Sequence, residues 1–215
     1  MKTSPLTLCL ITDFKRIPYS RYHAFLMQAI AGGITALQLR DKTLSPSTLL
    51  NIAHTLKEWL SPFSIPLIIN DHVDIAKSVN ADGIHGGHTD FSPEAARHLL
   101  GPDKIIGVSV DSIDALNDAN KLSCIDYIAA SAVFPSTSKH DCKTIWGLAG
   151  LKKLVDSSAH PVVAIGGIQL TNISSIIQQG AEGVAIISAI HLANNPEQMI
   201  RQMITAIHQT QEDKK

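Results

Sequence analysis

Two kinds of segment alternate along the chain. Short apolar runs rich in β-branched residues indicate buried strands, and longer stretches with apolar residues three or four positions apart indicate amphipathic helices. The short runs predict strands at residues 6–12, 36–40, 67–70, 83–87, 105–110, 127–133, 162–166 and 183–188. The longer stretches predict helices at residues 20–31, 46–60, 71–79, 92–100, 113–122, 147–155, 171–179 and 196–209.

Eight strand–helix repeats in 215 residues favour an α/β protein with one closed (β/α)8 barrel, the TIM barrel, over an open doubly wound sheet. Helix boundaries carry matching signals. Serine followed by proline at 45–46 and 92–93 indicates helix starts, Thr171 or Asn172 is a candidate cap, and glycines 32, 33 and 180 indicate helix ends. We expect residues 1–210 to form the single catalytic domain and residues 211–215, QEDKK, to be a disordered tail.

Composition and charge narrow the class of protein. Hydrophobic residues make up 45% and charged residues 17%, and the net charge of −1 gives no basic field for nucleic acid. Asp13 interrupts the apolar run near the amino terminus, so we expect neither a signal peptide nor a membrane span, and we expect a cytoplasmic protein. Cys9, Cys124 and Cys142 lack the spacing of a disulfide framework or a zinc site. A homo-oligomer is compatible with this composition.

Two aspartates stand at the ends of neighbouring predicted strands. Asp71 follows the strand at 67–70, and Asp90 follows the strand at 83–87. Because parallel strands joined by a helix end at the same edge, both carboxylates should face one space. Oxygen ligands of this kind are those that Mg²⁺ prefers, and it commonly takes only one or two from the protein. The pair therefore predicts a magnesium site.

Basic residues are predicted at the same rim. Arg40 and Lys42 follow the second strand and Lys139 follows the sixth, while Gln38 shares the face of Arg40. Arginine binds phosphate oxygens in a bidentate manner and lysine neutralises them, so three cations beside a metal site suit a bound diphosphate. Such a site stabilises the charge of a departing diphosphate without a protein nucleophile.

A second anion site is predicted after strands seven and eight. Loops at these positions of a barrel commonly bind phosphate through backbone N–H groups, and the pair Gly166-Gly167 would let the backbone approach closely. Ile187 and Ser188 follow the eighth strand. A glycine turn without a ligand is the alternative explanation.

Seven motifs occur in order along nearly the whole chain: QLRDK (38–42), NDHVDIA (70–76), DGIHGG with Asp90 (82–90), IIGVSV (105–110), VFPSTSK (133–139), AIGGI (164–168) and GVAIISAI (183–190). In these motifs the sequence resembles the thiamine phosphate synthase family. The resemblance implies a (β/α)8 barrel, a Mg²⁺ cofactor and two small-molecule substrates, hydroxymethylpyrimidine diphosphate and hydroxyethylthiazole phosphate. The implied mechanism is dissociative: diphosphate leaves, and the thiazole nitrogen attacks the resulting pyrimidine-methylene cation.

The resemblance also assigns residues. For the pyrimidine diphosphate it implies Gln38, Leu39, Arg40, Asp41, Lys42, Asn70, Ser109 and Lys139, of which Arg40, Lys42, Ser109 and Lys139 would be catalytic. The residues implied for the thiazole phosphate are Ser136, Thr137, Ser138, Gly167, Ile187 and Ser188. Asp71 and Asp90 would bind Mg²⁺.

Some positions depart from the family pattern. Ser131-Ala132 stands where the family has Gly-Pro, His72 where it has Arg, His88-Thr89 where it has Gln-Glu, and serines 136 and 138 where it has Thr. We expect His85 to be a packing or surface residue without a role. One alternative is a thiazole tautomerase, which would not need the metal or the diphosphate cations. Another is a non-catalytic barrel that binds a phosphorylated ligand.

Overall fold

A closed barrel of eight parallel strands forms the centre of the molecule. The computed structural model describes residues 4–87, 90–136 and 144–214. Each strand pairs with the next, and the last pairs with the first. The strands are β1 (Leu8–Ile11), β2 (Ala36–Leu39), β3 (Leu67–Asn70), β4 (Gly83–Gly87), β5 (Ile105–Val110), β6 (Tyr127–Ser131), β7 (Val162–Ile165) and β8 (Gly183–Ile186). The predicted (β/α)8 barrel is confirmed.

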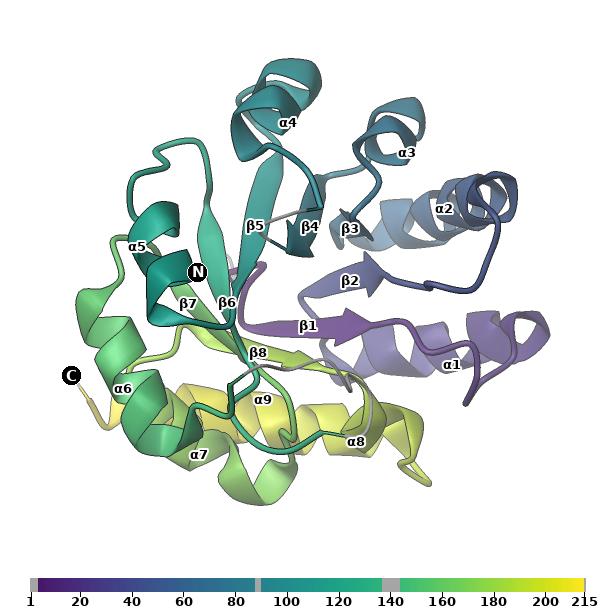
Figure 1. Cartoon of the computed structure of the whole chain (residues 1–215). Coiled ribbons are helices and arrows are strands. Elements are labelled where there is room, and N and C mark those ends of the chain that lie inside the picture. Colours follow the sequence, from purple (N-terminus) through teal and green to yellow (C-terminus); the bar gives the residue numbers. More distant parts are fainter. Residues whose placement is uncertain (1–3, 88–89, 137–143, 215) are drawn as a thin grey trace.

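Helices surround the barrel on the outside (Figure 1). They are α1 (Tyr19–Gly32), α2 (Pro46–Leu60), α3 (Val73–Ser78), α4 (Pro93–Leu100), α5 (Ile113–Ala119), α6 (Gly147–Ser157), α7 (Leu170–Gln178) and α9 (Pro196–Glu212). A 3-10 helix, η1 (Ser61–Phe63), and a four-residue helix, α8 (Ser188–His191), were not predicted. Helix α9 includes residues 211 and 212, which the sequence analysis assigned to the tail.

The two predicted serine-proline helix starts are confirmed by their hydrogen bonds. The hydroxyl of Ser45 accepts the N–H of Thr48, and Ser92 accepts that of Ala95, each at 3.2 Å. Helix α7 begins and ends one residue earlier than predicted, and the predicted cap was wrong: the N-cap is Gln169, and Thr171 and Asn172 lie inside the helix. The Asn172 side chain still contributes, because its oxygen accepts the N–H of Gln169 at 2.9 Å.

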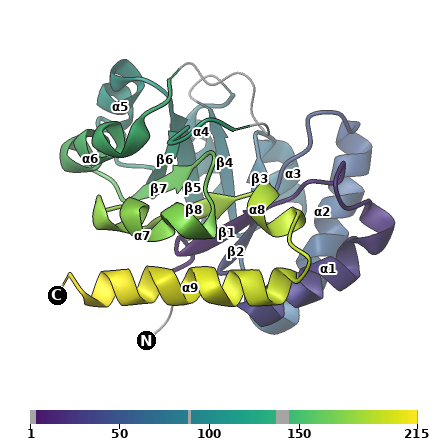
Figure 2. The same cartoon turned by 90° about the horizontal axis from the view of Figure 1, so that it is seen from below.

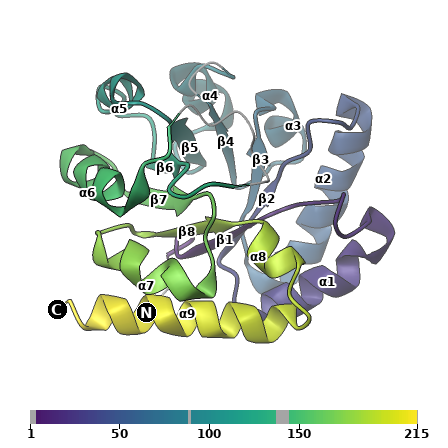
Figure 3. The ribbon, with the colours of Figure 1, turned by 60° about the horizontal axis from the view of Figure 1, so that its bottom comes forward.

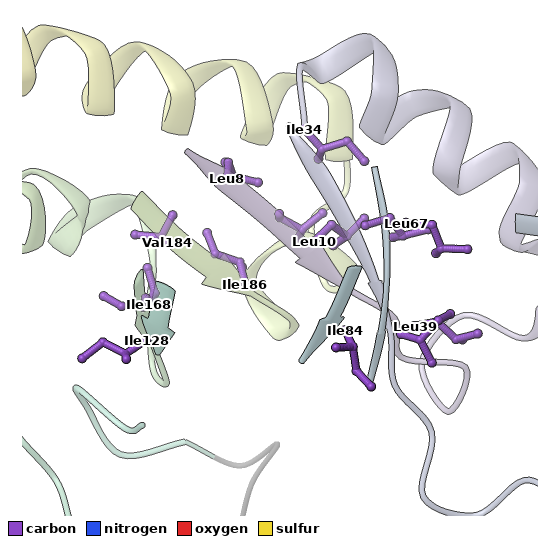
Figure 4. Close-up of a cluster of buried hydrophobic side chains, with 14 of the residues drawn as sticks. Leu8, Leu10, Ile34, Leu39, Leu67, Ile84, Ile128, Ile168, Val184 and Ile186 are labelled. Carbon is purple, nitrogen blue, oxygen red and sulfur yellow. The ribbon is translucent and has the colours of Figure 1, made fainter. Parts of the chain in front are cut away.

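Side chains of the strands alternate between two apolar layers. The outer layer lies between sheet and helices, and Figure 4 shows part of it, including Leu8, Leu10 and Leu39. The layer inside the barrel contains Cys9, Ile11, Ala36, Tyr127, Ala129, Val163 and Ala185. Because both faces of the sheet are buried, the strands are continuous apolar runs in the sequence.

Carboxylates before two strands fix the opposite, amino-terminal edge of the barrel. Asp82 accepts the N–H of Leu67 at 2.8 Å, and Asp126 accepts that of Ile106 at 2.7 Å. In both cases the carboxylate that precedes one strand binds the start of the strand before it. Arg97 donates to Asp126 from Nη2 at 2.7 Å and to the carbonyl oxygen of Cys124 from Nε at 3.1 Å.

Arg97 is expected to contribute strongly to stability, because its guanidinium also donates to the carbonyl of Gly101 at 3.0 Å. Lysine cannot reproduce this fork, so Arg97→Lys should lower the free energy of unfolding by about 2 kcal/mol in urea titrations. The matched control is Lys121→Ala, which removes an exposed ion pair with Asp118 and should cost under about 0.5 kcal/mol. Equal losses in the two variants would contradict this account of Arg97.

A buried histidine joins the end of the barrel to helix α1. The ring of His191 is 6% exposed, and its Nδ1 lies 2.8 Å from the carbonyl oxygen of Ile187. Because a carbonyl only accepts, Nδ1 carries the proton of the neutral ring. Nε2 therefore accepts from the hydroxyl of Tyr22, which is 3.2 Å away and fully buried.

The pKa of His191 makes stability depend on pH. Burial lowers this pKa below the ordinary 6.5, although the bond to Ile187 and the charge of Asp13 oppose the shift and Arg16 adds to it. As pH falls through about 6.5 the unfolded chain takes up the proton first, so the free energy of unfolding should fall until the folded ring is protonated as well. Urea unfolding over this range should show a smaller decrease in His191→Phe. Identical pH profiles for wild type and variant would refute the prediction.

Candidate active site

Asp71 and Asp90 meet at the carboxyl ends of β3 and β4. The N–H of Asp71 donates to the carbonyl of His85 at 2.8 Å, and the Asp90 carboxylate accepts the N–H of Gly87 at 2.6 Å. The two carboxyl groups lie close enough to interact. Burial raises the pKa of Asp71, and the neighbouring carboxyl group of Asp90 raises it further. The prediction that both side chains face one space is confirmed, and their role as metal ligands stays a prediction.

Positive charge lies beside this pair. Lys42 Nζ is 3.8 Å from an Asp71 carboxylate oxygen, and the charges of Lys42 and Arg40 both lower the pKa of Asp71. The backbone of Arg40 is fixed by Thr12, whose hydroxyl accepts the Arg40 N–H at 2.9 Å and donates to its carbonyl at 3.0 Å. The structure thus brings Arg40, Lys42, Asp71 and Asp90 to one part of the rim.

Leu39 and Asp41 have structural roles in the same loop. The side chain of Leu39 is fully buried in the outer apolar layer, which leaves only its backbone for a substrate contact. One carboxylate oxygen of Asp41 accepts from the N–H and the hydroxyl of Thr43, both at 2.7 Å, and from the N–H of Leu44 at 3.1 Å. Burial raises the pKa of Asp41, but these bonds outweigh burial and hold it below its usual value.

Polar side chains continue from the rim into the barrel. Gln38 and Asn70 are buried at the ends of β2 and β3, where β-register pairs Asn70 with His85. His85 Nε2 lies 3.0 Å from the hydroxyl of Ser109, and its Nδ1 lies 2.9 Å from that of Tyr127. We expected His85 to be a packing or surface residue without a role. It is buried, but it also binds the candidate site residue Ser109. Alternation along β4 places His85 inside the barrel, whereas its partners depend on a register that the sequence does not reveal.

A pocket lies on another part of the rim, between the loops after β6, β7 and β8. It brings together four of the predicted thiazole phosphate residues, namely Ser136, Gly167, Ile187 and Ser188. Gly167 has φ +63°, and a Cβ atom there would lie 2.6 Å from the carbonyl oxygen of Pro135. Glycine is therefore required by the turn itself as well as by any close approach of a ligand. The pocket borders an open groove lined by α7 residues and by Leu192 and Met199.

Three predicted site residues, Thr137, Ser138 and Lys139, lie outside the described residues, as do His88 and Thr89. Within the described ranges no cluster of three or more His, Cys, Asp or Glu side chains could hold a metal ion. The pair Asp71 and Asp90 nevertheless fits Mg²⁺, which is commonly bound by one or two carboxylates together with water and substrate phosphates.

The molecule is a closed (β/α)8 barrel with two features on its rim, an acidic pair beside cations and a glycine-lined pocket. These features are typical of barrels that handle phosphorylated small molecules. The chain belongs to the thiamine monophosphate synthase family, whose profile matches residues 8–190. It is therefore a transferase-type enzyme of thiamine biosynthesis, and the membership supports thiamine-phosphate synthase activity.

Individual relatives agree with this assignment. Thiamine-phosphate synthase of Chlamydia caviae is 44% identical over 189 residues, covering 88% of this chain and 89% of the relative. The enzyme of the same name from Vibrio parahaemolyticus is 41% identical and covers 88% and 92%. The solved thiamine phosphate pyrophosphorylase from Pyrococcus furiosus superposes with a TM-score of 0.85 at 33% identity, covering 96% of this chain and 97% of that one.

Solved structures of lower sequence identity show a likeness in fold alone. A crystal structure of 3-hexulose-6-phosphate synthase superposes with a TM-score of 0.70 at 14% identity. Among the helices that the structure describes, none has the length and apolar character needed to cross a membrane.

Proposed function

We propose that this protein joins hydroxymethylpyrimidine diphosphate to hydroxyethylthiazole phosphate in a Mg²⁺-dependent reaction that yields thiamine phosphate and diphosphate. The observation that carries the proposal is the meeting of Asp71 and Asp90 beside Lys42 and Arg40, on the same rim as the Gly167 pocket. The acidic pair with its cations suits a diphosphate and its metal, and the Gly167 pocket suits a single phosphate.

Negative charge develops on the leaving diphosphate as the reaction proceeds, at the part of the rim that contains Asp71, Asp90, Arg40 and Lys42. Asp71 and Asp90 would hold the metal, and the chemistry that Mg²⁺ supplies there is neutralisation of the diphosphate oxygens. The guanidinium of Arg40 would bind phosphate oxygens in a bidentate manner, and Lys42 and Lys139 would add positive charge. All three stabilise the leaving group as the methylene C–O bond breaks and its electron pair departs with the diphosphate.

The barrel interior would hold the pyrimidine. Gln38, Asn70 and Ser109 offer amide and hydroxyl groups at the inner ends of their strands, and His85 fixes Ser109 through the 3.0 Å bond. Deeper in the barrel the lining is apolar, with Ile11 and Ala129 among its members. Such surroundings keep water from the pyrimidine-methylene cation until the thiazole nitrogen attacks it.

The thiazole phosphate would lie against Ser136, Gly167, Ile187 and Ser188, with Thr137 and Ser138 from the same motif. Its position then fixes the thiazole nitrogen against the cation, so the protein contributes orientation in place of a covalent intermediate. A thiazole tautomerase would need this pocket alone. The acidic pair and its cations therefore favour the synthase over the tautomerase. We also propose that the protein is cytoplasmic.

The test is formation of thiamine phosphate, detected by mass spectrometry, from both substrates together with Mg²⁺. Omitting either substrate should abolish the product. Conversion of the thiazole phosphate to an isomer without a pyrimidine substrate would favour the tautomerase. Binding of both substrates without any product would favour the non-catalytic barrel.

A further inference from the structure

We propose that His191, held by Tyr22, is a positioning residue that orients the backbone between Ile187 and Ser188 for the phosphate of the thiazole substrate. This inference rests on the proposed function and specifies how one of its two subsites is built. Neither His191 nor Tyr22 belongs to the residues that border the pocket, so the effect would pass through the backbone.

The first step of the argument is the hydrogen bonding of one carbonyl. The oxygen of Ile187 accepts from Nδ1 of His191 at 2.8 Å and from the backbone N–H of His191 at 3.2 Å. A peptide unit is planar, so the direction of the Ile187 carbonyl also sets the direction of the Ser188 N–H. His191 therefore controls the orientation of a donor at the edge of the pocket that Ile187 and Ser188 line.

The second step is the anchoring of the His191 ring. Its Nε2 lies 3.2 Å from the hydroxyl of Tyr22, which holds the plane of the ring, while the Ile187 carbonyl sets the tautomer. The ring also packs against Phe25 with centroids 4.7 Å apart, and Tyr22 in turn packs edge-on against Phe14 at 4.8 Å. Tyr22 and Phe25 belong to α1, so the backbone after β8 is tied to a fourteen-residue helix.

The arrangement of the elements supports this link. Figures 2 and 3 both show α8 beside the end of α9 and close to α1, at the edge of the barrel where β8 finishes. Helix α8 has only four residues, and its few backbone hydrogen bonds give little rigidity by themselves. A contact to a longer helix supplies the rigidity that a phosphate site requires.

An apolar side chain could fill the space beside Phe25 and Tyr22, whereas an imidazole there must be taken out of water. The polar ring is explained if its two nitrogens are both used, one on the Ile187 carbonyl and one on Tyr22. A role in stability alone predicts that any loss of these bonds lowers the melting temperature and changes no substrate constant.

Steady-state kinetics of three variants distinguish these roles. His191→Phe keeps an aromatic ring and removes both bonds, and it should raise KM for the thiazole phosphate about 5- to 10-fold, the effect of one misdirected hydrogen bond. KM for the pyrimidine diphosphate should stay unchanged. Tyr22→Phe should raise the same constant about 2- to 3-fold, and adding it to His191→Phe should have no further effect. His191→Asn retains a donor near the Nδ1 position and should recover part of the affinity.

The matched control is Leu56→Ala in α2, which removes a fully buried side chain on another helix and should lower the melting temperature without changing either KM. If His191→Phe does not fold, Tyr22→Phe and His191→Asn carry the test. A wild-type protein without synthase activity would overturn the proposed function. An active wild type whose variants keep the normal KM for the thiazole phosphate would overturn the positioning role alone.

Discussion

Replacing Asp71 by Asn is expected to lower turnover by about 10²- to 10³-fold while leaving the fold intact. Asp71 has φ +64°, a left-handed conformation that asparagine tolerates better than most residues, so the variant should keep the backbone. The carboxylate lies against Asp90, and removing its charge relieves a repulsion. Stability should therefore be unchanged or slightly higher, and the loss should appear in kcat at saturating substrate.

A nearby acidic residue provides the control for this variant. Asp74 is exposed in the first turn of α3, three positions after Asp71 and outside the acidic pair. Asp74→Asn should leave turnover at the wild-type level. If Asp71→Asn retains full activity, or if both variants lose the same amount, Asp71 is not a metal ligand in the reaction.

Substituting Gly167 should act on the other substrate. Gly167→Ala places a Cβ atom 2.6 Å from the Pro135 carbonyl oxygen and from the Phe134 Cβ atom, at φ +63°. The loops after β6 and β7 must then separate, and Ser136 moves with its loop. We expect kcat/KM for the thiazole phosphate to fall about 10- to 100-fold, since small displacements at a phosphate site are costly.

Gly101→Ala is the matched comparison for backbone strain. Gly101 also has a positive φ, +99°, but a Cβ atom there would meet nothing within 4 Å, and the residue ends α4 far from the predicted site in the sequence. Both variants should be less stable, by about 1–3 kcal/mol, because alanine is strained at a positive φ. Equal kinetic losses in the two variants would show that strain, and not the phosphate pocket, explains the effect of Gly167→Ala.

The barrel itself could be predicted because each repeat carries its own signals. A strand buried on both faces is a continuous apolar run, and the serine-proline starts of α2 and α4 are local hydrogen-bonding features. Helix α8 could not be predicted, because four residues are too few to show a helical period. The N-cap of α7 was misassigned to Thr171 or Asn172 because glutamine is not among the preferred N-cap residues.

The site was predictable where residue type and strand end coincide, as for Asp71, Asp90 and Lys42. It was not predictable where a role depends on contacts between distant segments. His85 reaches Tyr127 across 42 residues, and His191 reaches Tyr22 across 169. Leu39 and Asp41 lie in a motif shared with the family, yet their side chains stabilise the outer layer and a turn. Within the motif at residues 38–42, the side chains of Leu39 and Asp41 therefore have structural roles, whereas Arg40 and Lys42 lie beside the acidic pair.

The most direct test of the central claim is the release of diphosphate by the purified protein, measured with both substrates in the presence of Mg²⁺ or of a chelator. The account predicts one diphosphate for each thiamine phosphate formed, and release that stops when the metal or either substrate is withheld. Undiminished release in the chelator would contradict the role of Asp71 and Asp90. Release from the pyrimidine diphosphate without formation of thiamine phosphate would contradict the proposed transfer.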